Sequence, residues 1–505
     1  MRLQVIVEAW EAVRVTRSRL AKRAALAATL ASSGESIELA AGYLAGELQQ
    51  RRTGVGWAAL RDLPDPSTSA TLTVAEVDAA FQTISELAGP GSATRRSALV
   101  RELFGRATAS EQAFLRGLVA GELRQGALDA LLLDAIAEAT GVEVEVVRRA
   151  AMLGGSTPEV ARAAFDGGEA ALRAFGLQVG RPVRPMLAGS APDVASGWEG
   201  MGSASGIAVD TKLDGVRVQV HRRGAEVRIF TRSLDEVTER MPGVVAQVLG
   251  LACEAVVLDG EALLLDEDGR PRPFQETASR SATRAGEEEL RGFFFDLLHR
   301  DGVDLIDLPY GERREALTAL APGMLTEVGT PPSAAQAEAR FADAVADGFE
   351  GVILKSLDAP YAAGRRGAGW VKVKPRHTLD LVVLAVERGS GRRQGWLSNI
   401  HLGARNPDGT FTMLGKTFKG MSDEILAWQT ERFRELEVAD DGYVVTLRPE
   451  QVVEVAFDGV QRSSRYPGGV ALRFARVVRY RDDKEAAEAD TLETVTRYLS
   501  GGRES

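Results

Sequence analysis

The sequence has little sulfur or imidazole chemistry to offer, with one cysteine, Cys253, and four histidines in 505 residues. A single thiol excludes an intramolecular disulfide framework, and it excludes a zinc site built from four cysteines. The histidines are scattered, without the spacing of metal ligands. A structural metal site of the Cys or His type is therefore not expected.

Long hydrophobic runs are also missing. The apolar stretch at the N-terminus is interrupted by Glu8 before an adequate secretory core can form. No other segment is apolar enough to span a membrane. The sequence therefore predicts a cytoplasmic protein.

The chain lacks an excess of positive charge, because 61 Lys and Arg face 71 Asp and Glu, a formal net charge of −10. This balance argues against a uniformly basic coat for nucleic acid. Local basic surfaces, and not the total, decide phosphate binding. The net charge therefore neither supports nor excludes a nucleic-acid partner.

The length suits about three domains at the usual ~100–200 residues each. The first third reads as helical, because Val13, Leu20, Leu26 and Leu30 recur near helical spacing and strand signals are scarce. A glycine- and proline-containing stretch over 176–197 looks like a connector, and we place a domain boundary near Gly180. Beyond residue 375, strand-like runs at 379–386 and 452–457 alternate with Gly-containing turns, which favours a small β-barrel.

The most informative feature present is Lys212-Leu213-Asp214-Gly215-Val216-Arg217, which sets a lysine, a carboxylate and an arginine around a Gly turn between two strand-like runs. An amine with a pKa near ~10.4 is protonated at neutral pH, so a nucleophilic role requires positive neighbours or desolvation. The alternative is a plain hairpin with a surface lysine. What favours a covalent nucleotidyl-transfer site is the presence of four further segments with charged residues at the edge of a short apolar run: 258–262, 293–298, 350–355 and 370–374.

In order and spacing these segments resemble the nucleotidyltransferase motifs of ATP-dependent DNA ligases, with the archaeal and actinobacterial type the nearest likeness. The segment 472–484 is similar to the last motif of that family, which ends in Arg-x-Asp-Lys. Ala475 stands where related enzymes often have proline, a difference that concerns backbone stiffness more than chemistry. The cysteine count agrees, since NAD-dependent bacterial ligases typically carry a four-cysteine zinc site.

The resemblance covers nearly the whole chain and implies its fold class. It implies an all-α DNA-binding domain over 1–179, a mixed α/β nucleotidyltransferase (adenylation) domain with largely antiparallel sheets over 180–375, and an all-β OB-fold domain with a polar tail over 376–505. The implied activity is ATP-dependent sealing of nicks between a 3′-hydroxyl and a 5′-phosphate in duplex DNA, in repair, replication or recombination.

The resemblance also assigns roles to single residues. It makes Lys212 the nucleophile on the α-phosphorus of ATP, Asp210 either an acceptor for the adenine amino group or a residue that fixes the loop, and Phe295 a ring stacked on adenine. It places Arg217 and Arg232 on ribose or phosphate oxygens. The remaining implied contacts are Glu261 near the ribose and metal, Glu350 on Mg²⁺ with Mn²⁺ as an alternative, Arg366, Lys372 and Lys374 on the phosphates, and Arg481, Asp483 and Lys484 at the leaving pyrophosphate after movement of the barrel.

The implied macromolecular partner is nicked double-stranded DNA, with the protein acting as a monomer associated with the nucleoid of a prokaryote. The segment 121–127 resembles a part of the ligase DNA-binding domain, with Arg124 and Gly126 as candidate contacts. Lys416 and Lys419 in the barrel are candidate contacts to the DNA backbone, and the alternative for them is a solvated turn. The Gly415-Lys416-Thr417 tripeptide lacks the upstream glycine spacing of a P-loop.

Other interpretations remain open at this level. Taken singly, Glu261 and Glu350 could cap turns, Phe295 could be a core aromatic and Arg232 a solvated strand end. The helical third could be a regulatory or scaffolding domain. For the whole chain the alternatives are an RNA ligase that acts on nicked duplexes and a nick-binding repair scaffold without turnover. An intact Lys212 and the retained Arg481-x-Asp483-Lys484 argue against the scaffold.

Overall fold

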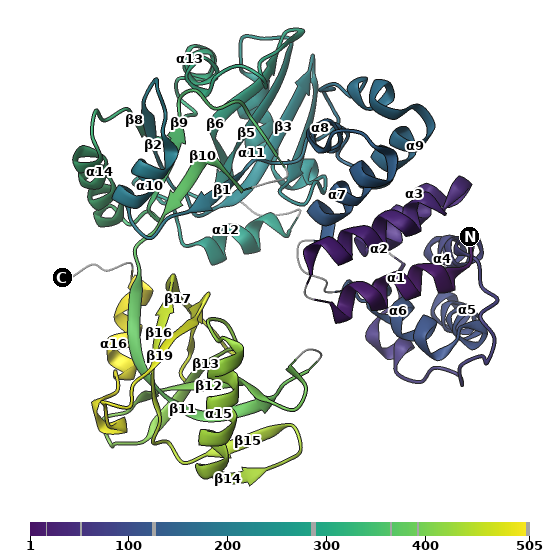
Figure 1. The fold of residues 1–505 in the computed structure, drawn as a ribbon. Coiled ribbons are helices and arrows are strands. Elements are labelled where there is room, and N and C mark those ends of the chain that lie inside the picture. Colours follow the sequence, from purple (N-terminus) through teal and green to yellow (C-terminus); the bar gives the residue numbers. More distant parts are fainter. Residues whose placement is uncertain are drawn as a thin grey trace.

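The structure, a computed structural model, describes residues 1–16, 18–50, 53–123, 128–283, 289–363, 366–390 and 393–500. It has a helical N-terminal segment, a mixed α/β middle segment and a β-rich C-terminal segment (Figure 1). The first and last segments each adjoin the middle one and lie apart from each other in this view. No helix of the described part is long and apolar enough to cross a membrane.

The N-terminal segment is helical, as the sequence predicts. Thr73 and Thr108 each form a reciprocal capping box with the glutamate three residues later, which fixes where two of the helices begin. Leu20 is an exception to the predicted apolar face, because it lies in the first turn of its helix and is 67% exposed. The helices are α1 Leu3–Val15, α2 Arg19–Ala31, α3 Ile37–Ala45, α4 Val74–Glu86, α5 Ser92–Arg106, α6 Ala109–Val119, α7 Leu128–Thr140, α8 Val144–Gly154 and α9 Thr157–Arg173.

Two five-stranded sheets form the middle segment, and all their pairings are antiparallel except that of β1 with β10. One sheet has the order β1 Leu187–Ser190, β10 Arg366–Val373, β9 Val352–Ser356, β2 Ile207–Thr211 and β8 Val328–Gly329. The other has the order β4 Glu226–Thr231, β3 Val216–Arg223, β5 Ala255–Leu263, β6 Arg291–Arg300 and β7 Val303–Asp304. The predicted mixed fold with largely antiparallel sheets is confirmed.

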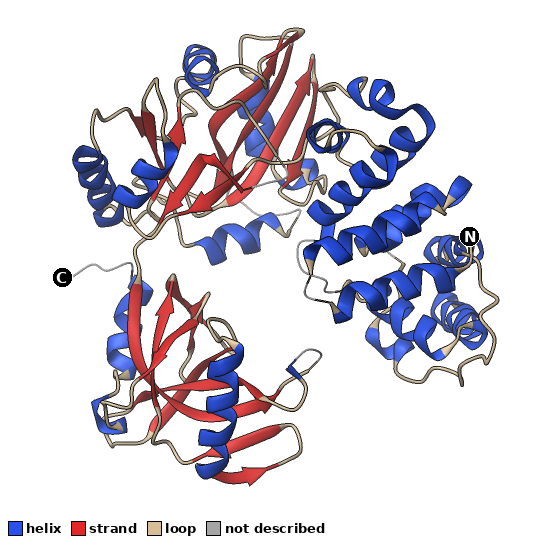
Figure 2. Cartoon of the chain, in the orientation of Figure 1, coloured by secondary structure: helices blue, strands red, loops and turns tan. Residues whose placement is uncertain are grey.

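The two sheets have separate apolar cores on their helix-covered faces (Figure 2). The core of the first sheet includes residues of α10 and α14, and that of the second includes residues of α11 and α13. The helices of this segment are α10 Val194–Met201, α11 Pro242–Leu249, α12 Phe274–Ser281, α13 Tyr310–Leu320 and α14 Ala334–Ala346.

The C-terminal segment is built on a seven-stranded sheet around one large apolar cluster. Its long first strand, β11 His377–Arg388, pairs with three other strands of the sheet. The other elements are β12 Leu397–Arg405, β13 Phe411–Thr417, β14 Glu437–Asp440, β15 Val444–Leu447, β16 Val452–Phe457, β19 Arg476–Tyr480, the separate pair β17 Gly459–Arg462 and β18 Val470–Arg473, and helices α15 Asp423–Glu435 and α16 Leu492–Arg497.

A buried polar network fastens the connector between the helical and middle segments to strand β3. The N–H of Gly180 donates to Nδ1 of His221 at 3.0 Å, and His221 Nε2 lies 2.8 Å from Gln219 Oε1. Since Nδ1 accepts, Nε2 carries the proton. Gln219 also accepts from the N–H of Val183 and donates to its carbonyl, so the imidazole and the amide together satisfy the connector backbone.

This network makes the stability of the protein depend on pH. Burial, with Arg228 and His299 nearby, lowers the pKa of His221 from 6.5 to about 3. Between pH 6.5 and pH 3 the imidazole of His221 is protonated in the unfolded chain but neutral in the folded chain. The contribution of this group to the free energy of unfolding is therefore fully present above pH 6.5 and is lost as the pH falls from 6.5 towards 3. We expect the free energy of unfolding to drop by roughly 2 kcal/mol between pH 7 and pH 5 from this group alone.

Denaturant unfolding at both pH values, on the wild type and on His221→Gln, measures this effect. The variant has no imidazole to titrate, so its free energy of unfolding should change less over the same interval. An identical pH dependence in the two proteins would contradict the assignment.

Candidate active site

Lys212 leaves the end of β2 in a loop that is fastened to the segment before β9. Its N–H donates to the Gly351 carbonyl at 2.9 Å, and its own carbonyl accepts from the N–H of Glu350 at 3.2 Å. Gly351 has φ +125°, and a Cβ there would lie 2.3 Å from the Val373 carbonyl oxygen. Gly215 is equally constrained, because a Cβ would lie 2.5 Å from the Ala262 carbonyl oxygen. Both glycines are therefore required for the loop over 212–215, called the lysine loop below, to pack against the neighbouring strands.

One carboxylate joins two lysines at the centre of the site. Glu350 forms ion pairs with Lys212 through Oε2 and with Lys374 through Oε1. The Lys212 and Glu350 side chains are 21% and 12% exposed. Burial opposes ionisation of Glu350, but the two lysines outweigh it and lower its pKa, whereas Glu350 raises the pKa of Lys374 against the effect of burial. The site therefore holds an ionised carboxylate within reach of the amine predicted to be the nucleophile.

Glu261 supplies a second carboxylate from strand β5 of the other sheet, where it pairs with Arg217 of β3 in the sheet register. Its Oε1 accepts from the N–H of Gly215 at 3.2 Å. Burial raises the pKa of Glu261 to about 7, although Lys212 and Arg217 act in the opposite direction. The desolvation of Glu261 therefore outweighs the effect of the two cations beside it.

Asp210 lies on β2 and is held by a buried lysine that the sequence interpretation missed. Lys355 Nζ lies 2.5 Å from Asp210 Oδ2, and the two side chains are 2% and 3% exposed. Thr326 donates to the other oxygen of Asp210 at 2.6 Å. The ammonium of Lys355 lies 4.5 Å from the ring centres of Phe295 and Trp370, at cation–π distance. Burial lowers the pKa of Lys355 even though Asp210 raises it.

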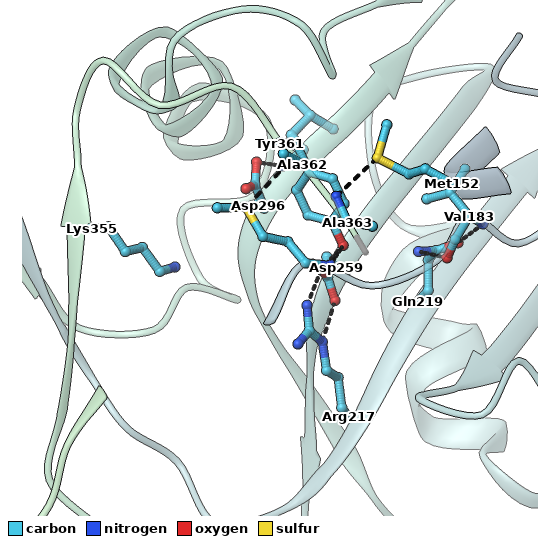
Figure 3. Close-up of polar contacts among 12 residues, drawn as sticks. Met152, Val183, Arg217, Gln219, Asp259, Asp296, Lys355, Tyr361, Ala362 and Ala363 are labelled. Atoms are coloured by element: carbon cyan, nitrogen blue, oxygen red, sulfur yellow. Dashed lines mark hydrogen bonds and ion pairs between the residues drawn. The ribbon is translucent and has the colours of Figure 1, made fainter. Parts of the chain in front are cut away.

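Arg217 points its guanidinium at a buried aspartate. Nε and Nη2 donate to the two oxygens of Asp259 at 3.1 and 2.7 Å, in a forked pair (Figure 3). Burial opposes the charge, but Asp259 more than offsets it and the pKa of Arg217 is raised. A cavity of ≈ 410 Å³ is lined by Val216, Arg217, Thr231, Arg232 and Ser233, so the two predicted anion-binding arginines face the same space.

The C-terminal segment reaches this site through Arg473, at the end of β18. Its guanidinium pairs with Asp214 of the lysine loop, with distances of 2.6 and 3.3 Å. Phe474 follows with φ +55° and is 56% exposed. The ammonium groups of Lys374 and Lys419 lie 5.9 and 5.6 Å from its ring centre, and Lys374 also pairs with Asp458 at 3.2 Å. The C-terminal segment thus contacts both the lysine loop and the end of strand β10.

The Arg-x-Asp-Lys motif does not take part in this contact in the structure. Arg481 and Lys484 both pair with Asp380 of β11, at 3.1 and 2.6 Å, and Arg481 pairs with Asp483 at 2.7 Å. Lys416, another predicted functional residue, forms an ion pair with Glu387 on the same sheet. The structure therefore brings Arg473 to the lysine loop and keeps the final motif on its own domain.

For some of the predicted site residues, the structure shows little or nothing about side-chain contacts. Arg124 and Gly126 lie outside the described residues, and so does the side chain of Arg366 at the start of β10. Lys372 lies on β10 and pairs in register with Ile353 of β9. Within the described ranges, no group of three or more His, Cys, Asp or Glu side chains forms a metal cluster.

The site therefore unites Asp210 of β2 and Glu261 of β5, one from each sheet, with residues next to strand ends: Lys212, Glu350 and Lys374. Lys355, Asp259 and Arg473 are the members that sequence reasoning did not assign. All three lie inside or directly beside motifs that the sequence displays, as the last residue of 350–355, the residue before Gly260 and the residue before Phe474. Their position in the motifs was a usable signal, but their partners are distant in sequence.

Comparisons with known proteins identify the family. Three family models match the chain: the ATP dependent DNA ligase domain over residues 185–374, the ATP dependent DNA ligase C terminal region over 393–484 and the DNA ligase N terminus over 61–137. A protein of Beutenbergia cavernae named "Probable DNA ligase" is 62% identical over 99% of this chain and 100% of its own length. One of Kineococcus radiotolerans with the same name is 60% identical over 98% of this chain and 99% of its own.

A solved structure titled "Pmar-Lig_PreS3" has the same overall fold, with a TM-score of 0.65 over 94% of this chain and 99% of that one, at 19% identity. At that identity the match speaks for the fold alone. The full-length relatives and the three family models decide the family. The chain belongs to the ATP-dependent DNA ligases.

Proposed function

We propose that this ligase seals nicks in duplex DNA with Lys212 as the covalent carrier of AMP. Nζ of Lys212 attacks the α-phosphorus of ATP, a P–N bond forms and pyrophosphate leaves. The nick's 5′-phosphate then attacks the lysyl-AMP phosphorus and releases the amine. Finally the 3′-hydroxyl attacks the activated 5′-phosphate, and AMP departs. The observation that carries the proposal is the position of Lys212, with its amine beside the Glu350 carboxylate and Glu350 in turn beside the Lys374 ammonium. Glu350 can take the proton that the Lys212 amine must lose before it attacks.

The nucleotide would lie between the two sheets beside Lys212. Asp210 would accept from the amino group of adenine, with Lys355 holding its carboxylate, and Phe295 would stack on the base. Arg217 and Arg232 would bind ribose or phosphate oxygens from the cavity that they share. Arg366, Lys372 and Lys374 would face the phosphates.

The residues present fit a divalent cation that arrives with the nucleotide. Mg²⁺ is usually bound by one or two carboxylates together with substrate phosphates. Glu261 accepts from the N–H of Gly215 and Glu350 pairs with Lys212, so these two carboxylates lie at the same loop and would hold Mg²⁺ or Mn²⁺. When bound, the cation supplies charge neutralisation at the phosphates.

The other segments would engage DNA and drive the domain movements. We propose that the helical segment up to residue 179 binds duplex DNA, with Arg124 and Gly126 among its contacts, and that the segment from 376 is an OB-fold whose Lys416 and Lys419 approach the backbone. The adenylation domain would span 180–375. During lysine adenylation a rotation of the C-terminal domain would bring Arg481, Asp483 and Lys484 to the leaving pyrophosphate. The protein would act as a monomer in the cytoplasm, associated with the nucleoid.

Label transfer tests the proposal. Protein freed of bound AMP is incubated with Mg²⁺ and α-labelled ATP, α-labelled GTP or adenylate-labelled NAD, and a nicked duplex with DNA or RNA at the 3′ side is then added. We expect label from ATP alone, and its discharge with strand sealing on the DNA nick. Nick binding without label would contradict the enzyme and favour a scaffold. Sealing confined to nicks with RNA at the 3′ side would assign an RNA ligase.

A further inference from the structure

A buried tyrosine, Tyr361, contacts the same aspartate as Arg217. Tyr361, in the segment between β9 and β10, is 1% exposed. Its hydroxyl donates to Asp259 Oδ2 at 2.6 Å, and Asp259 accepts the guanidinium fork of Arg217 (Figure 3). Burial, with Asp259 next, raises the pKa of Tyr361 well above its usual value, so this hydroxyl keeps the proton that it donates.

The hydroxyl of Tyr361 has no freedom to turn elsewhere. It also accepts from the N–H of Met186 at 3.0 Å, so both its donor and its acceptor capacity are used in one geometry. The ring packs edge-on against Trp370, with the ring centres 5.9 Å apart. The backbone N–H of Tyr361 donates to the Ile306 carbonyl at 3.0 Å.

Three parts of the chain pack around Tyr361: helix α8, the connector and strand β10. Met152 from helix α8 of the helical segment accepts from the N–H of Ala363 through its sulfur at 3.2 Å. Met186 from the connector accepts likewise from the N–H of Ala362 at 3.4 Å. Met152, Met186, Tyr361 and Trp370 belong to one apolar cluster that joins the helical segment to the sheets. A hydroxyl this firmly placed fixes the carboxylate that it touches.

Arg217 depends on that carboxylate for its direction. Its Nε and Nη2 donate to Asp259, and Nη1 donates to no other described residue. A rotation of the Asp259 carboxylate would turn the guanidinium plane with it, because a forked pair couples the two planes. A displacement of about 1 Å at a group that positions the substrate can lower the rate of the chemical step by about 10²-fold.

We propose that Tyr361 is a positioning residue for nick sealing, which acts on the reaction through Asp259 by fixing the plane of the Arg217 guanidinium. The inference rests on the proposed role of Arg217 at the nucleotide or nick phosphates. It assigns a kinetic function to a side chain that touches no substrate.

A double-mutant cycle tests the proposal. Tyr361→Phe keeps the ring against Trp370 and removes only the hydroxyl, and Arg217→Gln removes the fork. We expect single-turnover sealing of a pre-adenylated nick to fall by about tenfold in Tyr361→Phe and about a hundredfold in Arg217→Gln, with Tyr361→Phe adding less than about twofold in the Arg217→Gln background.

The matched control is Tyr43→Phe, a buried tyrosine of α3 whose hydroxyl has no hydrogen-bond partner in the described part of the chain. Sealing by this variant should equal that of the wild type. Asp259→Asn is the second variant, since it keeps an acceptor for Tyr361 and weakens the pair with Arg217. Its effect should also largely vanish in the Arg217→Gln background.

Each outcome decides the question. Equal losses from Tyr361→Phe with and without Arg217, or no loss at all, would overturn the inference and leave Tyr361 with a purely structural role. If Tyr361→Phe does not fold, additive effects of Asp259→Asn and Arg217→Gln would overturn it instead. If Arg217→Gln seals as fast as the wild type, the proposed role of Arg217 itself fails, which is a different result from a failed cycle.

Discussion

Replacing Lys212 by arginine is expected to abolish formation of the lysyl-AMP intermediate and overall nick sealing. Arginine keeps a positive charge for Glu350, so the ion pair that organises the site has a substitute. A guanidinium is not deprotonated in proteins and does not act as a nucleophile. We expect both rates to fall at least ~10⁴-fold, since no other step can replace the missing covalent bond. Label transfer from α-labelled ATP and sealing of a 5′-phosphate nick measure the two rates.

The last chemical step provides the internal control for this variant. Sealing of a nick that already carries AMP breaks no bond to Lys212, so Lys212→Arg should retain that step within about tenfold. Lys22→Arg, on helix α2 of the helical segment, is the matched substitution and should behave as the wild type. Residual adenylate on Lys212→Arg would assign the nucleophile to another residue.

Replacing Arg313 by leucine is expected to give a large loss of stability. Arg313 and Asp296 are both 0% exposed and form a forked pair at 2.7 and 2.9 Å. Arg313 also donates to the Ala359 carbonyl at 3.1 Å, which fixes the turn that leads to Tyr361. Removing the cation leaves Asp296 buried and unpaired, at a cost of roughly 3–5 kcal/mol. For a domain of this size that corresponds to a fall in melting temperature on the order of 10 °C.

Calorimetry on three proteins separates the pair from the loss of packing. Asp296→Leu together with Arg313→Leu removes both charges, so the double variant should melt well above Arg313→Leu alone. Arg340→Leu, which removes a partly exposed arginine from its pair with Glu327, is the surface control and should change the melting temperature little. A double variant that melts no higher than Arg313→Leu would show that the uncompensated charge is not the cause.

The strands around the site could be predicted from local pattern. The runs beside Lys212 form β2 and β3, the run at 293–298 lies within β6, and 452–457 coincides with β16. Short apolar runs bounded by glycine and charge carry this information, because strand formation depends on side-chain alternation and turn chemistry. The exposed position of Leu20 was not predictable in this way, since a helical repeat does not say where the first buried turn begins.

The sequence by itself determined the family and the order of the motifs, since both depend on contiguous residues. It also supplied the prediction that Lys212 is the attacking lysine. Only the tertiary structure decided the partners of those residues. Lys355 meets Asp210, Tyr361 meets Arg217 through Asp259, and Arg473 rather than Arg481 meets the lysine loop. Tyr361 and Asp259 are 102 residues apart in the sequence, and Arg473 and Asp214 are 259 residues apart. Strand pairing and domain packing bring such residues together, and neither is set by the local pattern of the chain.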